Sequence, residues 1–135
     1  MPNINTAYRW AINTCNNPKV GYSQSYRAQQ TVNGITYYDC SSFIWYALKA
    51  GGFDLTGYPF TTANMTAKLE ELGFTRLSTT VDWLPGDILH VRNSTHQHTE
   101  MVYSGRRTMG AHTGKKPLAD QVSINDYDTP SDYYT

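Results

Sequence analysis

The chain has 135 residues, enough for one domain that buries roughly two thirds of its unfolded surface without disulfides or a metal. Its 11 Lys and Arg residues balance 11 Asp and Glu residues, which argues against the basic surface of a nucleic-acid-binding protein. No stretch approaches the ~20 apolar residues of a membrane span, and Met1 to Trp10 lack the pattern of a secretory signal. We expect one domain that binds neither nucleic acid nor membrane.

Helical patterns dominate the first half of the chain. Ile4 to Cys15 has helical apolar spacing, with Asn5 or Thr6 as the N-cap, and Val20 to Thr31 is interpreted as a loop that forms a cleft wall. Ile35 to Tyr38 is extended. The next helix, Cys40 to Ala50, has Asp39 as its N-cap and stops at Gly51-Gly52. A third helix, capped by Thr61 or Thr62, has an apolar stripe at Met65, Leu69 and Leu72 and ends at Gly73.

Short β-type runs follow the helices. They are Phe74 to Leu77, Asp87 to Val91, Thr99 to Ser104, Thr108 to His112, and Val122 to Asn125. Helices that precede an antiparallel sheet indicate an α+β domain over residues 1–125. Residues 126–135 are interpreted as a tail or the start of a linker.

Aromatic residues gather beside one of the two cysteines. Many of the 11 Tyr, 4 Phe and 3 Trp residues lie between Tyr22 and Phe60, around Cys40. Such residues either fill the core or line a groove for a polar polymer, such as a sugar or a peptide. Both cysteines, Cys15 and Cys40, are expected to be free thiols, because a disulfide scaffold of this size would carry more of them.

Cys40 stands where an extended segment meets a helix. The first turn of a helix presents unpaired N–H groups and the positive end of the dipole, which favour a thiolate over a thiol. Cys40 is therefore a candidate nucleophile that needs a histidine. The chain has four: His90, His96, His98 and His112.

Strand parity allows His98 and His112 to lie on one face, depending on the loop between their strands. In a hairpin with an odd loop, Gly105 to Arg107, Ser104 faces Thr108 and Glu100 faces His112, so that His98 and His112 share one face. A two-residue loop would put the two histidines on opposite faces.

Four motifs together resemble a known family. They are Tyr22, Asp39-Cys40-Ser41-Ser42-Phe43, Pro85-Gly86-Asp87-Ile88, and His98-Thr-Glu-Met-Val-Tyr followed by Met109-Gly-Ala-His112. In order and spacing they are similar to the papain-like peptidoglycan hydrolases of the NlpC type, and most similar to the cysteine amidase domains of phage endolysins.

The resemblance implies a papain-like fold with Cys40 as nucleophile, His98 as base and His112 as the residue that orients it. Many relatives carry this third residue at the position of Gly110, and His112 is the substitute expected here. Tyr22, Asp39 and Ser41 are expected to bind substrate or the oxyanion, with Asp39 more a helix cap than a proton carrier.

The alternatives for these residues are plain. Cys15 is expected to be a buried thiol in the core, and His90 a structural histidine within a strand. Asp87 is expected to form part of the turn that precedes a strand. His96-Gln97-His98 has metal-binding spacing, but the close cysteine pair of common zinc sites is absent, so we expect no metal and no cofactor. A catalytically silent cell-wall-binding module stays open as a second function.

The implied reaction is hydrolysis of an amide in bacterial peptidoglycan, either the bond between N-acetylmuramic acid and L-alanine or one within the stem peptide. The resemblance to the phage group favours the first, while the related fold also hosts γ-D-glutamyl endopeptidases. It further implies synthesis in the bacterial host cytoplasm and action on the wall. The linker-like tail suggests, as a hypothesis, a C-terminal wall-binding domain outside this chain.

Overall fold

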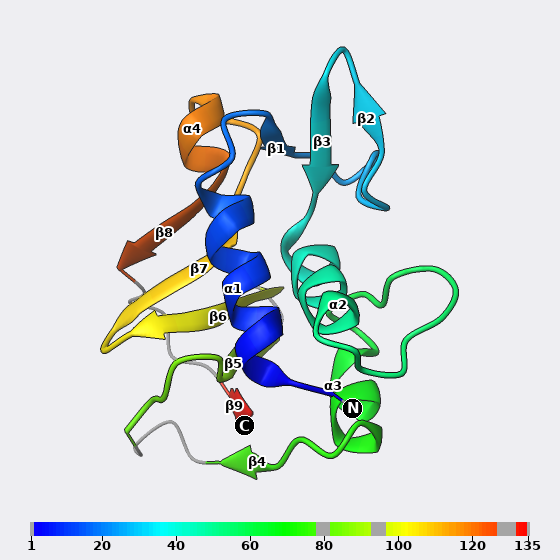
Figure 1. Ribbon diagram of the computed structural model, residues 1–135, viewed down its shortest axis with the longest axis vertical. Helices are drawn as coiled ribbons and strands as arrows, with labels where there is room; N and C mark the ends of the chain where they lie inside the picture. Colours follow the sequence, from blue (N-terminus) through cyan, green and yellow to red (C-terminus); the bar gives the residue numbers. More distant parts are fainter. Residues whose placement is uncertain (1, 78–81, 93–96, 127–131, 135) are drawn as a thin grey trace.

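The computed structural model describes residues 2–77, 82–92, 97–126 and 132–134. Two helices pack on a six-stranded sheet, and a small three-stranded sheet stands beside them (Figure 1). The helices are α1 (Ile4–Cys15), α2 (Cys40–Ala50), α3 (Met65–Glu71) and α4 (Leu118–Gln121). The expected α+β arrangement, with N-terminal helices on a C-terminal antiparallel sheet, is confirmed.

The large sheet is antiparallel throughout. Its strand order is β4-β9-β5-β6-β7-β8. These strands are β4 (Arg76–Leu77), β5 (Ile88–Arg92), β6 (Gln97–Ser104), β7 (Arg107–Ala111), β8 (Val122–Asp126) and β9 (Asp132–Tyr134). Strand β9 lies between β4 and β5 and is not expected from the sequence, and residues 127–131 and 135 lie outside the described part of the chain.

The small sheet replaces part of an expected loop. It consists of β1 (Val20–Tyr22), β2 (Thr31–Val32) and β3 (Ile35–Tyr38). The assignment of Val20 to Thr31 as a loop is therefore wrong at both ends. Strand β1 pairs with β3 in parallel, with Tyr22 beside Tyr38, and this pairing holds Tyr22 near the start of α2. The signal was weak because a three-residue strand has no readable period.

Helix α2 is specified by its own sequence. Asp39 Oδ1 accepts a hydrogen bond from the Ser42 N–H at 2.9 Å, and Ser42 Oγ accepts one from the Asp39 N–H at 2.9 Å, a reciprocal capping box. The helix ends at Gly51, as expected. Its buried side chains, Phe43, Ile44, Trp45, Ala47 and Leu48, form the centre of the core. The N-terminus of α2, and with it Cys40, is thus fixed by both the cap and the core.

The caps of the other two helices differ from expectation. Asn3, rather than Asn5 or Thr6, caps α1, because its Oδ1 accepts from the N–H groups of Asn5 at 2.9 Å and Thr6 at 3.3 Å. Helix α3 begins after Asn64, so neither Thr61 nor Thr62 is its N-cap.

The β6–β7 hairpin has a shorter turn than expected. Ser104 pairs with Arg107, which leaves a two-residue loop, but the register shifts by one residue between Val102 and Ser104. This bulge gives β6 one extra residue and restores the parity that an odd loop would have set, although not the same register. Beyond the bulge Met101 pairs with Met109, and continuing that register places Glu100 opposite Gly110 rather than His112. His98 and His112 still share a face, but for a different reason.

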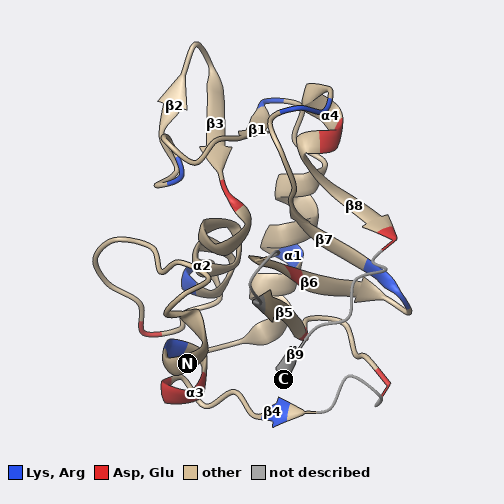
Figure 2. Cartoon of the chain, turned by 180° about the vertical axis from the view of Figure 1, so that it is seen from behind, with Lys and Arg blue, Asp and Glu red and all other residues tan. Residues whose placement is uncertain are grey.

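Charged residues are dispersed over the molecule (Figure 2). The acidic position between β3 and α2 is Asp39. Among the described residues, no helix has the length and apolar character needed to cross a membrane.

Candidate active site

A cavity of about 420 Å³ lies where the N-terminus of α2 meets the ends of β6 and β7. Cys40, His98 and His112 all line it, together with Tyr22. Residues from three separate parts of the sequence therefore meet in one pocket, as expected. Cys40 is the first residue of α2 and is partly exposed.

His98 is held between the thiol and a carboxylate. One interaction is a hydrogen bond with Cys40. The other joins His98 Nε2 to Glu100 Oε2 at 2.6 Å. Because Nε2 of His98 faces the carboxylate, Nδ1 is the ring nitrogen that can form the hydrogen bond with the Cys40 sulfur. A thiol, an imidazole and a carboxylate thus stand in one chain of contacts.

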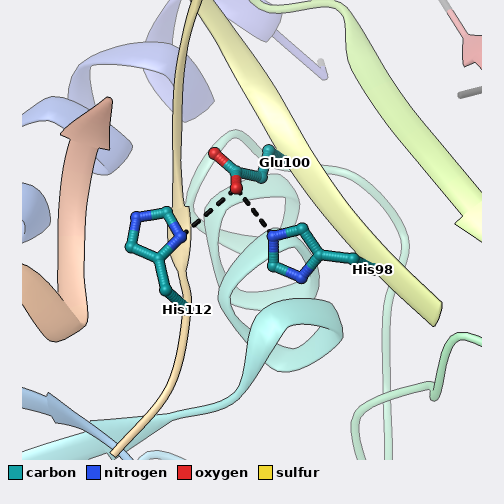
Figure 3. A group of neighbouring side chains, drawn as sticks. All are labelled: His98, Glu100 and His112. Carbon is teal, nitrogen blue, oxygen red and sulfur yellow. Dashed lines mark hydrogen bonds and ion pairs between the residues drawn. The ribbon is translucent and has the colours of Figure 1, made fainter. Parts of the chain in front are cut away.

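Glu100 joins both histidines (Figure 3). The same oxygen that contacts His98 lies 3.2 Å from Nδ1 of His112, and Thr108 Oγ1 donates to the other oxygen at 2.5 Å. The side chain of Glu100 is only 2 % exposed. A buried carboxylate without partners would be costly, and here every partner is a hydrogen-bonding group.

The contacts shift the pKa values of the pair in opposite directions. Burial alone would lower the pKa of His98, but the hydrogen bonds with Cys40 and Glu100 and their charges outweigh it and raise the pKa to about 9. Burial alone would raise the pKa of Glu100, but hydrogen bonds from His112 and His98 lower it to about 2. The site therefore favours an imidazolium beside a carboxylate at neutral pH.

The expected role of His112 needs correction. We expected His112 to orient His98, but Glu100 is the residue that contacts the His98 ring, and the two imidazole centroids are 6.1 Å apart. His112 instead supports Glu100 through Nδ1, while its Nε2 lies 3.3 Å from the carbonyl oxygen of Ser123. Sequence reasoning missed Glu100, although its spacing of two residues from His98 on one strand puts both side chains on one face.

A second missed residue, Arg27, fastens the start of α2. Its Nε donates to Asp39 Oδ2 at 2.7 Å and its Nη2 donates to Ser41 Oγ at 3.0 Å. It also donates to the backbone carbonyls of Pro59, at 2.9 Å, and Phe60. The guanidinium is buried and its contacts leave little room for another group. Arg27 therefore ties the helix cap to the loop before α3.

Asp39 and Ser41 belong to this structural network. Asp39 caps the helix and pairs with Arg27, in agreement with its expected role as an anchor. Ser41 lines the pocket but is 2 % exposed, with its hydroxyl between Arg27 and Asp39.

Tyr22 lies on the pocket wall. Its backbone N–H donates to Gln121 Oε1 at 2.8 Å, and its hydroxyl accepts from Gln24 Nε2 at 3.3 Å. Burial raises the pKa of Tyr22, and the negative charge of Cys40 raises it further. The phenol is therefore a protonated donor close to the sulfur.

The remaining candidates lie elsewhere. Cys15 has its pKa raised to about 12 by burial and by the Glu100 charge, against a hydrogen bond from the Gly110 backbone. His90 is buried with Nδ1 3.3 Å from Thr66 Oγ1, and Asp87 Oδ2 accepts from the Leu84 N–H at 2.8 Å in a turn. His96 lies outside the described residues.

One group of side chains has the chemistry of a metal site. The nearest ligand atoms of His98, Glu100 and His112 lie within 4.8 Å of one another. Two imidazoles and a carboxylate suit a divalent transition metal. These same atoms are already joined by hydrogen bonds, the shortest of 2.6 Å, so a cation would have to displace the contacts that orient His98.

The fold matches those of solved NlpC/p60 domains. The NlpC/p60 domain of the peptidoglycan hydrolase SagA has a TM-score of 0.59 and 18% identity, over 98% of this chain and 94% of the other. The P60 domain of an antigen from M. avium subspecies paratuberculosis has the same TM-score and identity, over 98% of this chain and 95% of the other. At this identity the likeness defines the chain as a domain with an NlpC/p60-like fold.

The family itself follows from the sequence. Residues 3–116 match the family model described as bacteriophage peptidoglycan hydrolase, so the chain belongs to that family. Its substrate is therefore bacterial peptidoglycan. No curated protein shows a significant sequence match to the chain.

Proposed function

We propose that the chain hydrolyses an amide bond of peptidoglycan with Cys40 as nucleophile. The observation that carries this proposal is the contact series from Cys40 through His98 to Glu100 inside one pocket. A raised His98 pKa and a carboxylate behind the imidazole are the conditions for a thiolate–imidazolium pair.

The residues suit the following steps. The Cys40 thiolate attacks the amide carbonyl carbon, and the negative charge passes to the oxygen, near first-turn N–H groups of α2 and the Tyr22 hydroxyl. His98 gives its proton to the nitrogen as the C–N bond breaks, which releases an amine and leaves a thioester. His98 then takes a proton from water, which attacks the thioester and frees a carboxylic acid and Cys40. Glu100 keeps the imidazole oriented and stabilises its charge, with His112 as its support.

The bond that we propose is the amide between N-acetylmuramic acid and L-alanine. Membership of the bacteriophage peptidoglycan hydrolase family and the resemblance to the cysteine amidase domains of phage endolysins support this choice. The alternative is an endopeptidase that cuts within the stem peptide, which would use the same residues.

The test is mass spectrometry of purified Gram-positive peptidoglycan after digestion. Wild type is compared with Cys40→Ala and with Cys15→Ser, a matched change at the other, partly buried cysteine. Stem peptides that begin at L-alanine, released by wild type and Cys15→Ser alone, would establish the amidase. Fragments cut inside the stem would establish the endopeptidase. Products that persist in Cys40→Ala would refute the cysteine mechanism, and their absence in all proteins would favour a wall-binding module.

A further inference from the structure

A second cavity adjoins the candidate active site. It has a volume of about 520 Å³ and lies over the loop between α2 and α3. Thr61 lines both this cavity and the catalytic pocket, so the two are neighbours. A polymeric substrate is much larger than the catalytic pocket, and its remaining units must lie along such neighbouring surface.

Tyr58 forms an aromatic platform in this second cavity. The Arg27 guanidinium lies 5.4 Å from the centroid of its ring, an arrangement that steadies the ring through a cation–π contact. The residue is 67% exposed, so much of its ring is open to solvent. Arg27 also donates to Ser41, next to Cys40, so one side chain contacts both the Tyr58 ring and the start of α2.

The rest of the lining mixes apolar side chains with polar ones, and its charges are balanced. Thr56, Thr61 and Asn64 supply hydroxyl and amide groups. The two charged residues of this lining, Lys68 and Glu71, pair with each other at 3.2 Å. Arg27 is likewise compensated by Asp39. A surface whose charges are paired in this way has little to attract the carboxylates of a stem peptide.

From this chemistry we propose that the Tyr58 cavity binds a sugar unit of the glycan strand, an N-acetylhexosamine, while the scissile amide occupies the catalytic pocket. The apolar face of the sugar ring would lie on the exposed face of Tyr58, and its hydroxyl and acetamido groups would bond to the threonine and asparagine side chains. This inference rests on the proposed function, because it assigns the glycan side of the same substrate.

Binding is tested apart from catalysis, with the full chain carrying Cys40→Ala and with N,N′,N″-triacetylchitotriose as the probe. We expect saturable NMR shifts at residues 56–64, lost in Tyr58→Ala and retained in Tyr58→Phe. Tyr26→Ala, a change at an exposed tyrosine outside both cavities, should leave them unchanged. Absence of shifts with the folded protein, or shifts there caused by a stem peptide and not by the sugar, would overturn the assignment.

Kinetics provide the second readout. In the catalytically intact chain, Tyr58→Ala should raise the KM for peptidoglycan about 3- to 10-fold, the loss expected for one aromatic stacking contact, with kcat little changed. An unchanged KM would refute the sugar site while Cys40-dependent cleavage continued. Loss of cleavage in the Cys40 variant is a separate result, so failure of the sugar site and failure of the proposed function are distinguishable.

Discussion

Gly110 makes room for the carboxylate of Glu100. A Cβ atom at position 110 would lie 2.8 Å from Glu100 Cγ, closer than real side chains approach one another. Many NlpC-type relatives, by the resemblance noted above, carry a third catalytic residue at this position of the strand. In this chain Glu100, on the neighbouring strand, fills that space instead. The absence of a side chain at Gly110 is what allows the Glu100 side chain to lie there.

Gly110→Ala should therefore disturb the site itself. We expect a loss of about 1–3 kcal/mol in unfolding free energy from the clash, together with a fall in activity as Glu100 moves away from His98. Urea unfolding and peptidoglycan clearance measure the two effects. Gly114→Ala is the matched control, because its Cβ would make only an ordinary contact, 3.6 Å from the Tyr22 carbonyl oxygen. In a Glu100→Ala background, Gly110→Ala should cost less unfolding free energy than it does in the wild type. If the effects of the two substitutions on unfolding free energy simply add, the proposed contact between positions 100 and 110 is wrong.

Glu100→Gln removes the charge with little change of shape. The neutral amide cannot stabilise an imidazolium, so the His98 pKa should fall and kcat should drop by about 10²-fold. Histidine titration by NMR and steady-state kinetics test this together. Glu70→Gln, an exposed glutamate on α3, provides the control. An unchanged His98 titration in folded Glu100→Gln would show that the carboxylate does not hold the charge.

Activity should fall as the pH rises through about 9. The His98 pKa is raised to that value, so its proton is present below it and lost above it, and with it the acid that protonates the leaving amine. The rate of peptidoglycan clearance across this range is the measurement. In Glu100→Gln the alkaline limb should move to lower pH, since one of the interactions that raise the pKa is gone. If the alkaline loss of activity occurs at the same pH in wild type and Glu100→Gln, it reports the titration of a group other than His98.

Arg27→Met should destabilise the domain by about 3–5 kcal/mol, because the change leaves the buried Asp39 carboxylate and two backbone carbonyls without their donor. Denaturant unfolding gives the free energy. Arg107→Met is the comparison: its pair with Asp126 is exposed and 3.5 Å long, so the loss should stay below about 1 kcal/mol. Equal losses of unfolding free energy in the two variants would show that Arg27 does not anchor the start of α2.

Local signals in the sequence predicted much of the fold. Helix α2 carries its own cap at Asp39 and its own stop at Gly51, so its position follows from neighbouring residues alone. The meeting of Cys40 with His98 and His112 also followed from the sequence, through strand parity and family resemblance. Strand parity correctly placed the two histidines on one face, but it assumed a three-residue loop where the hairpin has a two-residue loop and a bulge. A bulge cannot be detected from the alternation of polar and apolar residues.

The missed residues depend on long-range contacts. Glu100 looks like the solvent-facing residue of a strand, and only the sheet partner Gly110 and the helices above it make that position a buried one. Arg27 stands in a polar segment and looks solvated, although its partners are as far away as Phe60. Strand β9 joins the sheet through β4 and β5, which lie far from it in the sequence, and no local pattern encodes such a pairing.

The two thiols have different environments, so one of them should react selectively with an alkylating reagent. Burial and the nearby Glu100 charge keep Cys15 protonated, with its pKa raised to about 12, whereas Cys40 opens onto a pocket beside an imidazolium. One equivalent of an alkylating reagent at neutral pH should mark a single position on the folded protein. The count of functional molecules in any preparation can then be read directly as the amount of label bound.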